Sequence, residues 1–192
     1  MILYLHGFRS SPLSFKARMT ADRMAARGRG DAFMCPQLPA SPKAAMALCL
    51  RLVAHYDSEE LALIGSSLGG FYATWLAEQL DCRAVLLNPA VHPFQDLERH
   101  VGVSTQYHSD APFEFKRDYL AELDDLAVPA ISAPDRYYLI AASGDEVLDY
   151  RQMVSHYAGA RQTIIDGSDH ALSDYAEHVD AVLAFCGEGG RR

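Results

Sequence analysis

The segment that decides the fold is LALIGSSLGG, residues 61–70. It joins an apolar run, typical of a strand buried on both faces, to a Gly-x-Ser-x-Gly motif centred on Ser67, and a helical pattern follows. On a tight turn between a strand and a helix the serine hydroxyl projects from the sheet, and the positions two before and two after it have no room for large side chains. Gly65 and Gly69 occupy these positions. We therefore predict that Ser67 is a nucleophile.

Ser66 is the alternative nucleophile of this pair. It would place Ile64 and Leu68 at the two crowded positions, so we reject it. Ser67 also precedes the first turn of the expected helix, where free N–H groups and the helix dipole favour developing negative charge. A glycine-rich turn without chemistry is the competing interpretation, since the bare pattern is common and only its context makes it specific.

Outward from this segment, short apolar runs alternate with stretches of helical spacing. The runs expected to be strands are Ile2–Leu5, Ala32–Cys35, Leu61–Ile64, Ala84–Leu87, Tyr137–Ala141 and Thr163–Ile165. One helical stretch begins at Ser41-Pro42, a cap followed by proline at the first helical position. This alternation predicts an α/β fold: a mostly parallel six-stranded sheet with helices on both faces. Functional side chains of such sheets collect at the carboxyl ends of the strands.

Residues 89–135 break the alternation. They contain no convincing strand, are rich in proline and aromatic residues, and favour one short helix around Glu114–Leu123. A long excursion within a compact domain is usually functional or disordered, and the aromatic content argues against disorder. We therefore predict a single domain over residues 1–192, with a lid at about 89–135 inserted between strands.

A serine hydroxyl needs a neighbouring base, and His170 is the predicted one. It follows the last predicted strand in a loop before the last helix, at the sheet edge expected for Ser67. His6 is expected to be a structural hydrogen-bond partner. Solvated helix or lid positions are expected for His55, His100, His156 and His178. The roles of His92 and His108 stay open.

The acid that orients the base is expected after the strand Tyr137–Ala141. Asp145 lies at that strand's carboxyl end and is our choice, with Glu146 and Asp149 as alternatives. Asp169 adjoins the base in sequence and is poorly placed to bond its far ring nitrogen. The chain order is then serine, aspartate, histidine, with each residue type supplied by a separate loop.

Attack on an ester carbonyl builds negative charge on its oxygen, which two backbone N–H groups can stabilise. One is expected from Leu68, the residue after the nucleophile. The other is expected from Phe8, in the loop that follows the first strand, where Gly7 allows a sharp exit. Arg9 could bind an acidic substrate group or could simply be a surface arginine.

Composition and charge exclude some classes of function. The formal net charge of −8 over 192 residues argues against nucleic acid as a partner. No secretory signal pattern precedes His6, and no apolar run approaches the roughly 20 residues of a membrane span. Four scattered cysteines without a C-x-x-C pair predict free thiols in a reducing cytoplasm. We expect a cytoplasmic protein without a metal or organic cofactor.

Several motifs together resemble the YqiA-like esterases of bacteria. They are YLHGFRSSP at 4–12, GSSLGG at 65–70, LNPAV at 87–91, GDEVLD at 144–149 and GSDH at 167–170. The resemblance spans nearly the whole chain and implies an α/β-hydrolase fold with Ser67, Asp145 and His170 at the triad positions. It also implies a cytoplasmic carboxylesterase or thioesterase whose substrate is a small acyl ester or an acyl-CoA.

Two other functions are compatible with the same sequence. An acyltransferase or a perhydrolase would use the same serine, histidine and aspartate with a different acceptor for the acyl group. A binding module could retain the fold without turnover, since a fold alone does not prove a function.

Overall fold

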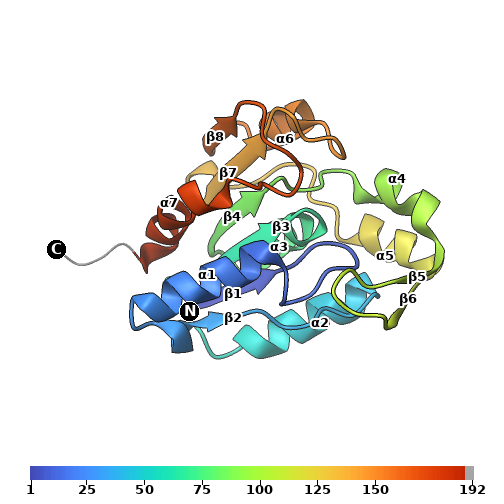
Figure 1. Ribbon diagram of the computed structural model, residues 1–192, viewed down its shortest axis with the longest axis horizontal. Helices are drawn as coiled ribbons and strands as arrows, with labels where there is room; N and C mark the ends of the chain where they lie inside the picture. Colours follow the sequence, from blue (N-terminus) through green and yellow to red (C-terminus); the bar gives the residue numbers. More distant parts are fainter. Residues whose placement is uncertain (189–192) are drawn as a thin grey trace.

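The computed structural model describes residues 1–188 and contains a six-stranded sheet whose paired strands all run parallel (Figure 1). The spatial order of its strands is β2-β1-β3-β4-β7-β8. Their bounds are β1 Ile2–Leu5, β2 Phe33–Met34, β3 Ala62–Ser66, β4 Arg83–Leu87, β7 Tyr137–Ala142 and β8 Arg161–Ile165. Leu5 pairs with Gly65, and Ser66 pairs with Leu87. The carboxyl ends of β1, β3 and β4 therefore meet at one edge.

Helices connect these strands. Those that cover the sheet are α1 Phe15–Ala26, α2 Pro42–Val53, α3 Leu68–Leu80, α6 Tyr150–His156 and α7 Val179–Leu183. Short 3₁₀ turns occupy Gly30–Ala32, Glu98–His100, Pro134–Arg136 and Tyr175–Glu177. The predicted cap of α2 is confirmed, because the Ser41 side chain accepts a hydrogen bond from the N–H of Ala44 at 3.1 Å. Within residues 1–188, no helix combines the length and apolar character that crossing a membrane requires.

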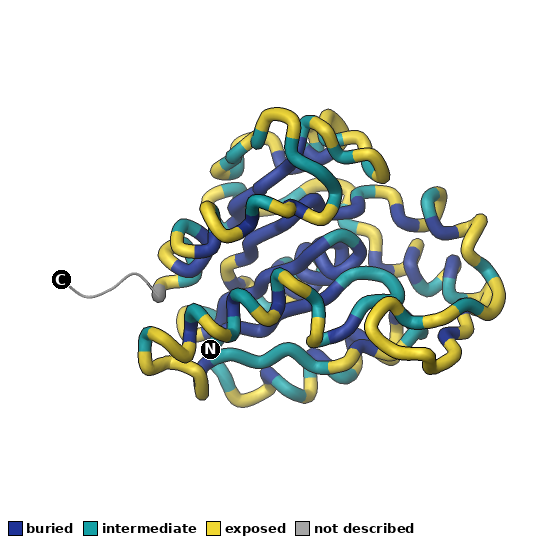
Figure 2. Tube along the Cα trace, in the orientation of Figure 1, coloured by how far each residue is buried: buried dark blue, intermediate teal, exposed yellow. Residues whose placement is uncertain are grey.

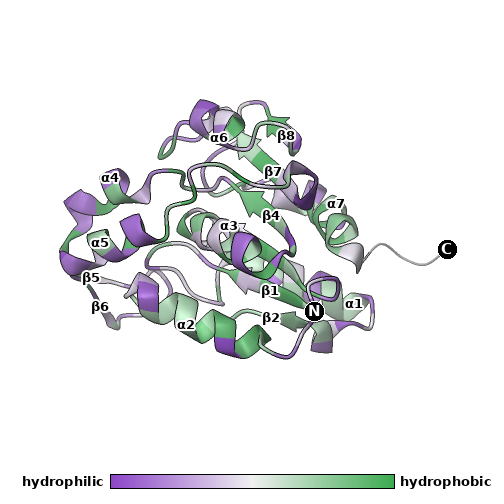
Figure 3. Ribbon diagram, turned by 180° about the vertical axis from the view of Figure 1, so that it is seen from behind, coloured by the Kyte–Doolittle hydropathy of each residue, from purple (hydrophilic) through white to green (hydrophobic). Residues whose placement is uncertain are grey.

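The two faces of the sheet form separate apolar cores, because successive side chains of a strand point to opposite faces. Leu3, Leu5 and Leu63 pack in the core with α2, α3 and α6. Ile2, Tyr4 and Ile64 pack in the core with α1 and α7. The central strands β1, β3, β4 and β7 are accordingly almost entirely buried in Figure 2 and mostly hydrophobic in Figure 3. The predicted fold class, a mostly parallel six-stranded sheet with helices on both faces, is confirmed.

The segment 89–135 differs from the prediction. It contains α4 Pro93–Leu97, β5 Gly102–Thr105, β6 Pro112–Phe115 and α5 Asp118–Asp125. The expectation of no strand there was wrong, since β5 and β6 pair as an antiparallel hairpin. Phe113 and Phe115 are buried while Glu114 between them is exposed, an alternation typical of a half-buried strand. The predicted helix from Glu114 therefore begins only at Asp118, because β6 takes the residues before it.

Candidate active site

Ser67 lies on the tight turn between β3 and α3. Its backbone has φ 54° and ψ −122°, a conformation that side-chain-bearing residues rarely adopt. A Cβ added to Gly65 would lie 2.2 Å from the carbonyl oxygen of Gly69, and one added to Gly69 would lie 2.0 Å from the carbonyl oxygen of Leu5. The structure thus confirms that both positions exclude any side chain, and the turn presents the Ser67 hydroxyl at the sheet edge.

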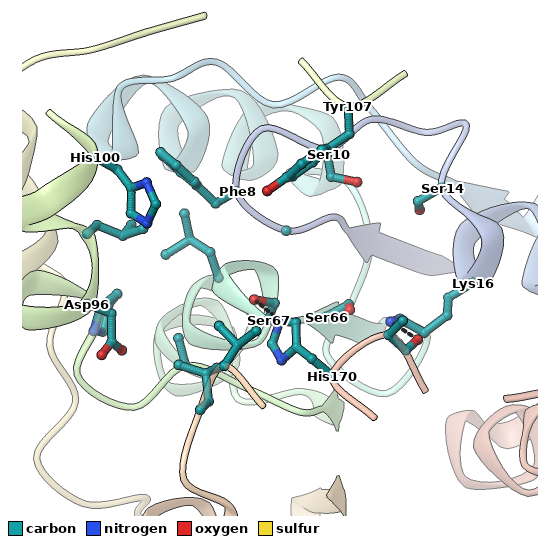
Figure 4. A pocket seen from close by; sticks show the side chains of 18 of the residues that line it. Phe8, Ser10, Ser14, Lys16, Ser66, Ser67, Asp96, His100, Tyr107 and His170 are labelled. Atoms are coloured by element: carbon teal, nitrogen blue, oxygen red, sulfur yellow. Dashed lines mark hydrogen bonds between the residues drawn. The ribbon is translucent and has the colours of Figure 1, made fainter. Parts of the chain in front are cut away.

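The structure brings Ser67, His170 and Asp145 together (Figure 4). Nε2 of His170 lies 3.1 Å from Oγ of Ser67, and Nδ1 of His170 lies 2.8 Å from Oδ2 of Asp145. The Asp145 side chain is completely buried. Its Oδ1 accepts hydrogen bonds from the N–H groups of Val147 and Leu148, both at 2.8 Å. Three donors therefore fix the carboxylate, and the carboxylate fixes the imidazole.

The alternative acids occupy other positions. Glu146 accepts a hydrogen bond from the backbone N–H of His170 at 3.0 Å, so it supports the loop and leaves the ring free. Asp149 caps α6 by accepting from the N–H of Arg151. Asp169 accepts from the N–H and the hydroxyl of Ser173, and these bonds lower the pKa of Asp169.

Other histidines have structural partners. Nε2 of the buried His6 accepts from the N–H of Leu38 at 3.0 Å, and its Nδ1 lies 3.0 Å from the carbonyl oxygen of Gly7. The ring is therefore neutral with its proton on Nδ1, and burial lowers the pKa of His6. This confirms the expected structural role of His6. His108, whose role was open, lies 3.1 Å from the Ser11 hydroxyl.

The loop after β1 passes directly beside the serine. A Cβ added to Gly7 would lie 3.3 Å from Cβ of Ser67. Within residues 1–188, the N–H groups of Phe8 and Leu68 donate to no protein acceptor. Both residues line the cavity around Ser67, so their N–H groups remain free to bind a ligand oxygen there.

Arg9 fastens this loop to the β5–β6 hairpin. Its Nε donates to the carbonyl oxygen of Thr105 at 2.7 Å, and its guanidinium lies over the Tyr107 ring at 4.8 Å. The Phe8 ring meets Phe113 edge to face, with 5.2 Å between the centroids. Arg9 does not line the cavity around Ser67. The structure does not support the substrate-binding interpretation, and it gives Arg9 a packing role that neither interpretation included.

A cavity of about 670 Å³ surrounds Ser67 and His170. Apolar side chains make up much of its wall, among them Phe8, Leu68, Pro93, Leu97 and Leu148. Polar groups gather elsewhere: Figure 4 shows His100 and Asp96 on one side of Ser67, and Lys16 and Ser14 on the other. The volume is in the range of small-molecule sites.

Asn88 is a residue whose importance the sequence did not reveal. It is fully buried at the end of β4, with φ 43°. Its Nδ2 donates to the carbonyl oxygens of Asp169 at 3.0 Å and His170 at 3.1 Å, and its Oδ1 accepts from the N–H of Ala142 at 2.8 Å. Asn88 thus ties the His170 loop to the ends of β4 and β7. The available signal was a polar residue between an apolar strand and Pro89.

Potential metal ligands are dispersed, and three cysteine thiols are weakly acidic, in the described part of the chain. Within residues 1–188, no three His, Cys, Asp or Glu side chains are grouped so that they could hold a metal ion. Cys35, Cys49 and Cys82 carry free thiols, and burial raises the pKa of each to about 12.

The sheet order, the strained serine turn and the histidine loop after the last strand define the α/β-hydrolase fold class. The chain belongs to UPF0227, described as an uncharacterised protein family, whose model matches residues 1–187. This is the YqiA-like family, so the resemblance drawn from the sequence motifs is confirmed.

Solved structures share this architecture at low sequence identity. A presumed hydrolase from Agrobacterium vitis S4 is 21% identical with a TM-score of 0.76, over 96% of this chain and 87% of that one. Mouse alpha/beta hydrolase domain-containing protein 10 is 14% identical with a TM-score of 0.70, over 97% and 86%. Est1E from Butyrivibrio proteoclasticus, solved with ferulic acid bound, is 14% identical with a TM-score of 0.68, over 98% and 88%. These likenesses establish the fold.

Proposed function

We propose that this protein is a serine carboxylesterase or thioesterase that hydrolyses acyl esters through an acyl-enzyme intermediate. One observation supports this most strongly: an unbroken hydrogen-bonded path runs from Ser67 through both ring nitrogens of His170 to the buried Asp145, in the wall of a cavity. Acyl transfer to serine requires a base within hydrogen-bond reach of the hydroxyl and an orienting acid within hydrogen-bond reach of that base.

In the first step, Oγ of Ser67 attacks the carbonyl carbon of the ester while Nε2 of His170 takes the hydroxyl proton. The carbonyl π electrons move to the oxygen, and the N–H groups of Phe8 and Leu68 stabilise the resulting negative charge. The Asp145 carboxylate stabilises the imidazolium that forms. Its bonds to two backbone N–H groups hold it in place throughout.

When the oxyanion re-forms the carbonyl, the bond to the leaving oxygen or sulfur breaks and that atom takes the proton from Nε2 of His170. The acyl group then remains on Ser67. Water repeats the sequence: it gives a proton to His170, attacks the acyl carbon, and releases the carboxylic acid as Oγ recovers its proton. Asn88 would hold the loop that carries His170 in the same position during acylation and deacylation.

The cavity suggests how the acyl chain is held. Its apolar wall, formed in part by Phe8, Leu68 and Leu97, suits a hydrocarbon chain. Segment 89–135 supplies Pro93 and Leu97 to this wall and packs on Phe8, which supports its role as a lid. Small acyl esters and acyl-CoA thioesters are the candidate substrates.

A panel of para-nitrophenyl esters and acyl-CoA thioesters of graded chain length tests this proposal. Ser67→Ala should lower kcat by a factor on the order of 10⁴ or more while leaving the unfolding transition cooperative. A fluorophosphonate probe should label wild-type protein at Ser67 and nowhere else. A well-folded protein that turns over no ester and takes no label would instead be a binding module. Adding alcohol, amine or peroxide acceptors and analysing the products separates hydrolysis from acyl transfer.

A further inference from the structure

Lys16 places an ammonium group in the wall of the cavity around Ser67 and His170. It lies in the first turn of α1, and Nζ donates to the carbonyl oxygen of Ala171 at 2.5 Å. Because Ala171 follows His170 in the chain, this bond holds the ammonium beside the catalytic loop. Figure 4 shows Lys16 next to His170, on the side away from His100 and Asp96.

The charge on Lys16 has no carboxylate partner among residues 1–188. Within residues 1–188, no Asp or Glu oxygen lies within 4.0 Å of Nζ. The Asp169 carboxylate accepts hydrogen bonds from Ser173, and the Asp145 carboxylate accepts them from His170 and two backbone N–H groups. Burial lowers the pKa of Lys16 to about 8, and the charges of these two aspartates oppose that shift. The amine is therefore mostly protonated at neutral pH, and two of its three N–H donors have no acceptor within residues 1–188.

The chemistry of the triad identifies which part of a substrate meets this charge. The imidazole that takes the serine proton must next deliver it to the leaving oxygen or sulfur, so the leaving group lies on the His170 side of the acyl carbon. Lys16 is bonded to the residue after His170 and lies on the same side. The hydroxyl of Ser14, which also lines the cavity there, makes no hydrogen bond within residues 1–188.

We propose, on the basis of the function proposed above, that Lys16 determines specificity by binding a negative charge on the leaving group. The preferred substrate is then an ester or thioester whose alcohol or thiol carries an anionic group. The ammonium donates its two free N–H groups to that anion, and the Ser14 hydroxyl adds a third donor. Neutral esters remain substrates, because Lys16 contacts none of the reacting atoms.

Two matched substrates test this proposal. One is the butyrate ester of ortho-nitrophenol, and the other is the same ester with a carboxylate added to the phenol ring. For Lys16→Met, kcat/KM on the anionic ester should fall about ten- to hundredfold, as expected for a lost charge-assisted hydrogen bond. On the neutral ester kcat/KM should change by less than about threefold. Most of the loss on the anionic ester should appear as a higher KM.

Lys16→Arg should recover most of the loss, because it keeps the positive charge. Arg18→Met is the matched control, because it removes an equal charge from the exposed side of the same helix. It should leave unchanged the ratio of kcat/KM for the anionic ester to kcat/KM for the neutral ester. If Lys16→Met slows both esters equally, Lys16 only braces the loop that carries His170; if it slows neither, Lys16 does not act in the reaction. Either outcome overturns the proposal.

Wild-type protein alone provides a second measurement if Lys16→Met does not fold. The carboxylated nitrophenol should inhibit hydrolysis of the neutral ester competitively, and more strongly than ortho-nitrophenol does. Added salt should weaken that inhibition. Equal inhibition by the two phenols would overturn the proposal. Failure of the hydrolase function itself has a different signature, since wild-type protein would then hydrolyse neither ester.

Discussion

Replacing Asp145 by asparagine is the sharpest perturbation of the proposed triad, because the structure determines how the amide must orient. Oδ1 of Asp145 accepts from two backbone N–H groups, those of Val147 and Leu148. In Asp145→Asn the amide oxygen takes that place, since the NH₂ group would meet two donors there. The NH₂ group then faces Nδ1 of His170, which currently lies 2.8 Å from Oδ2. Nδ1 must become the acceptor, and the ring proton moves to Nε2.

That tautomer cannot accept the proton of Ser67, because the nitrogen 3.1 Å from Oγ already carries one. We expect kcat on a short para-nitrophenyl ester to fall by roughly 10³–10⁴-fold, as it does when an orienting carboxylate is lost from other serine hydrolases. The two backbone hydrogen bonds survive, so the midpoint of thermal unfolding should change by only a few degrees.

Steady-state kinetics and differential scanning calorimetry on the same preparation measure both effects. Glu146→Gln is the matched control, because Glu146 accepts from the backbone N–H of His170 and does not contact the ring. It should cost less than about tenfold in kcat. A tenfold or smaller loss in Asp145→Asn, or equal losses in the two variants, would refute the assignment of Asp145 as the orienting acid.

Three further predictions concern the scaffold of the site. Gly69→Ala adds a Cβ that would lie 2.0 Å from the carbonyl oxygen of Leu5, so denaturant titration should show a loss of roughly 3 kcal/mol or more in the free energy of unfolding, or no folded protein. Asn88→Ala removes three hydrogen bonds that tie the loop carrying His170 to the sheet. We expect kcat to fall about ten- to hundredfold with KM nearly unchanged. An unaltered kcat would show that other contacts hold the loop. His6 has a pKa lowered by burial, so the unfolded chain binds its proton more readily. Stability should therefore decrease as pH falls below about 6.5 toward the folded pKa, and His6→Gln should show a shallower decrease in urea titrations at a series of pH values.

The sequence alone determined the positions of all six sheet strands and the serine turn. These features leave a local signature: continuous apolar runs predict buried strands, and the spacing of Gly65, Ser67 and Gly69 predicts the tight turn. The clash that excludes a side chain at Gly65 arises within the turn, whereas the clash at Gly69 comes from Leu5 on the neighbouring strand. The hairpin in segment 89–135 was missed although Phe113, Glu114 and Phe115 alternate, because its strands have only four residues each and one carries mostly exposed side chains.

Only the tertiary structure could show which of the candidate acids contacts the histidine, although the sequence already favoured Asp145. Asp145, Glu146 and Asp149 all follow β7, and loop conformation alone directs the first of them at His170. The importance of Asn88 and Lys16 depends on contacts with partners 81 and 155 residues away in the chain. A local sequence pattern predicts helices and strands because their backbone conformation depends on residues that are close together in the sequence. The meeting of distant side chains depends on how those elements pack, and no short stretch of sequence encodes it.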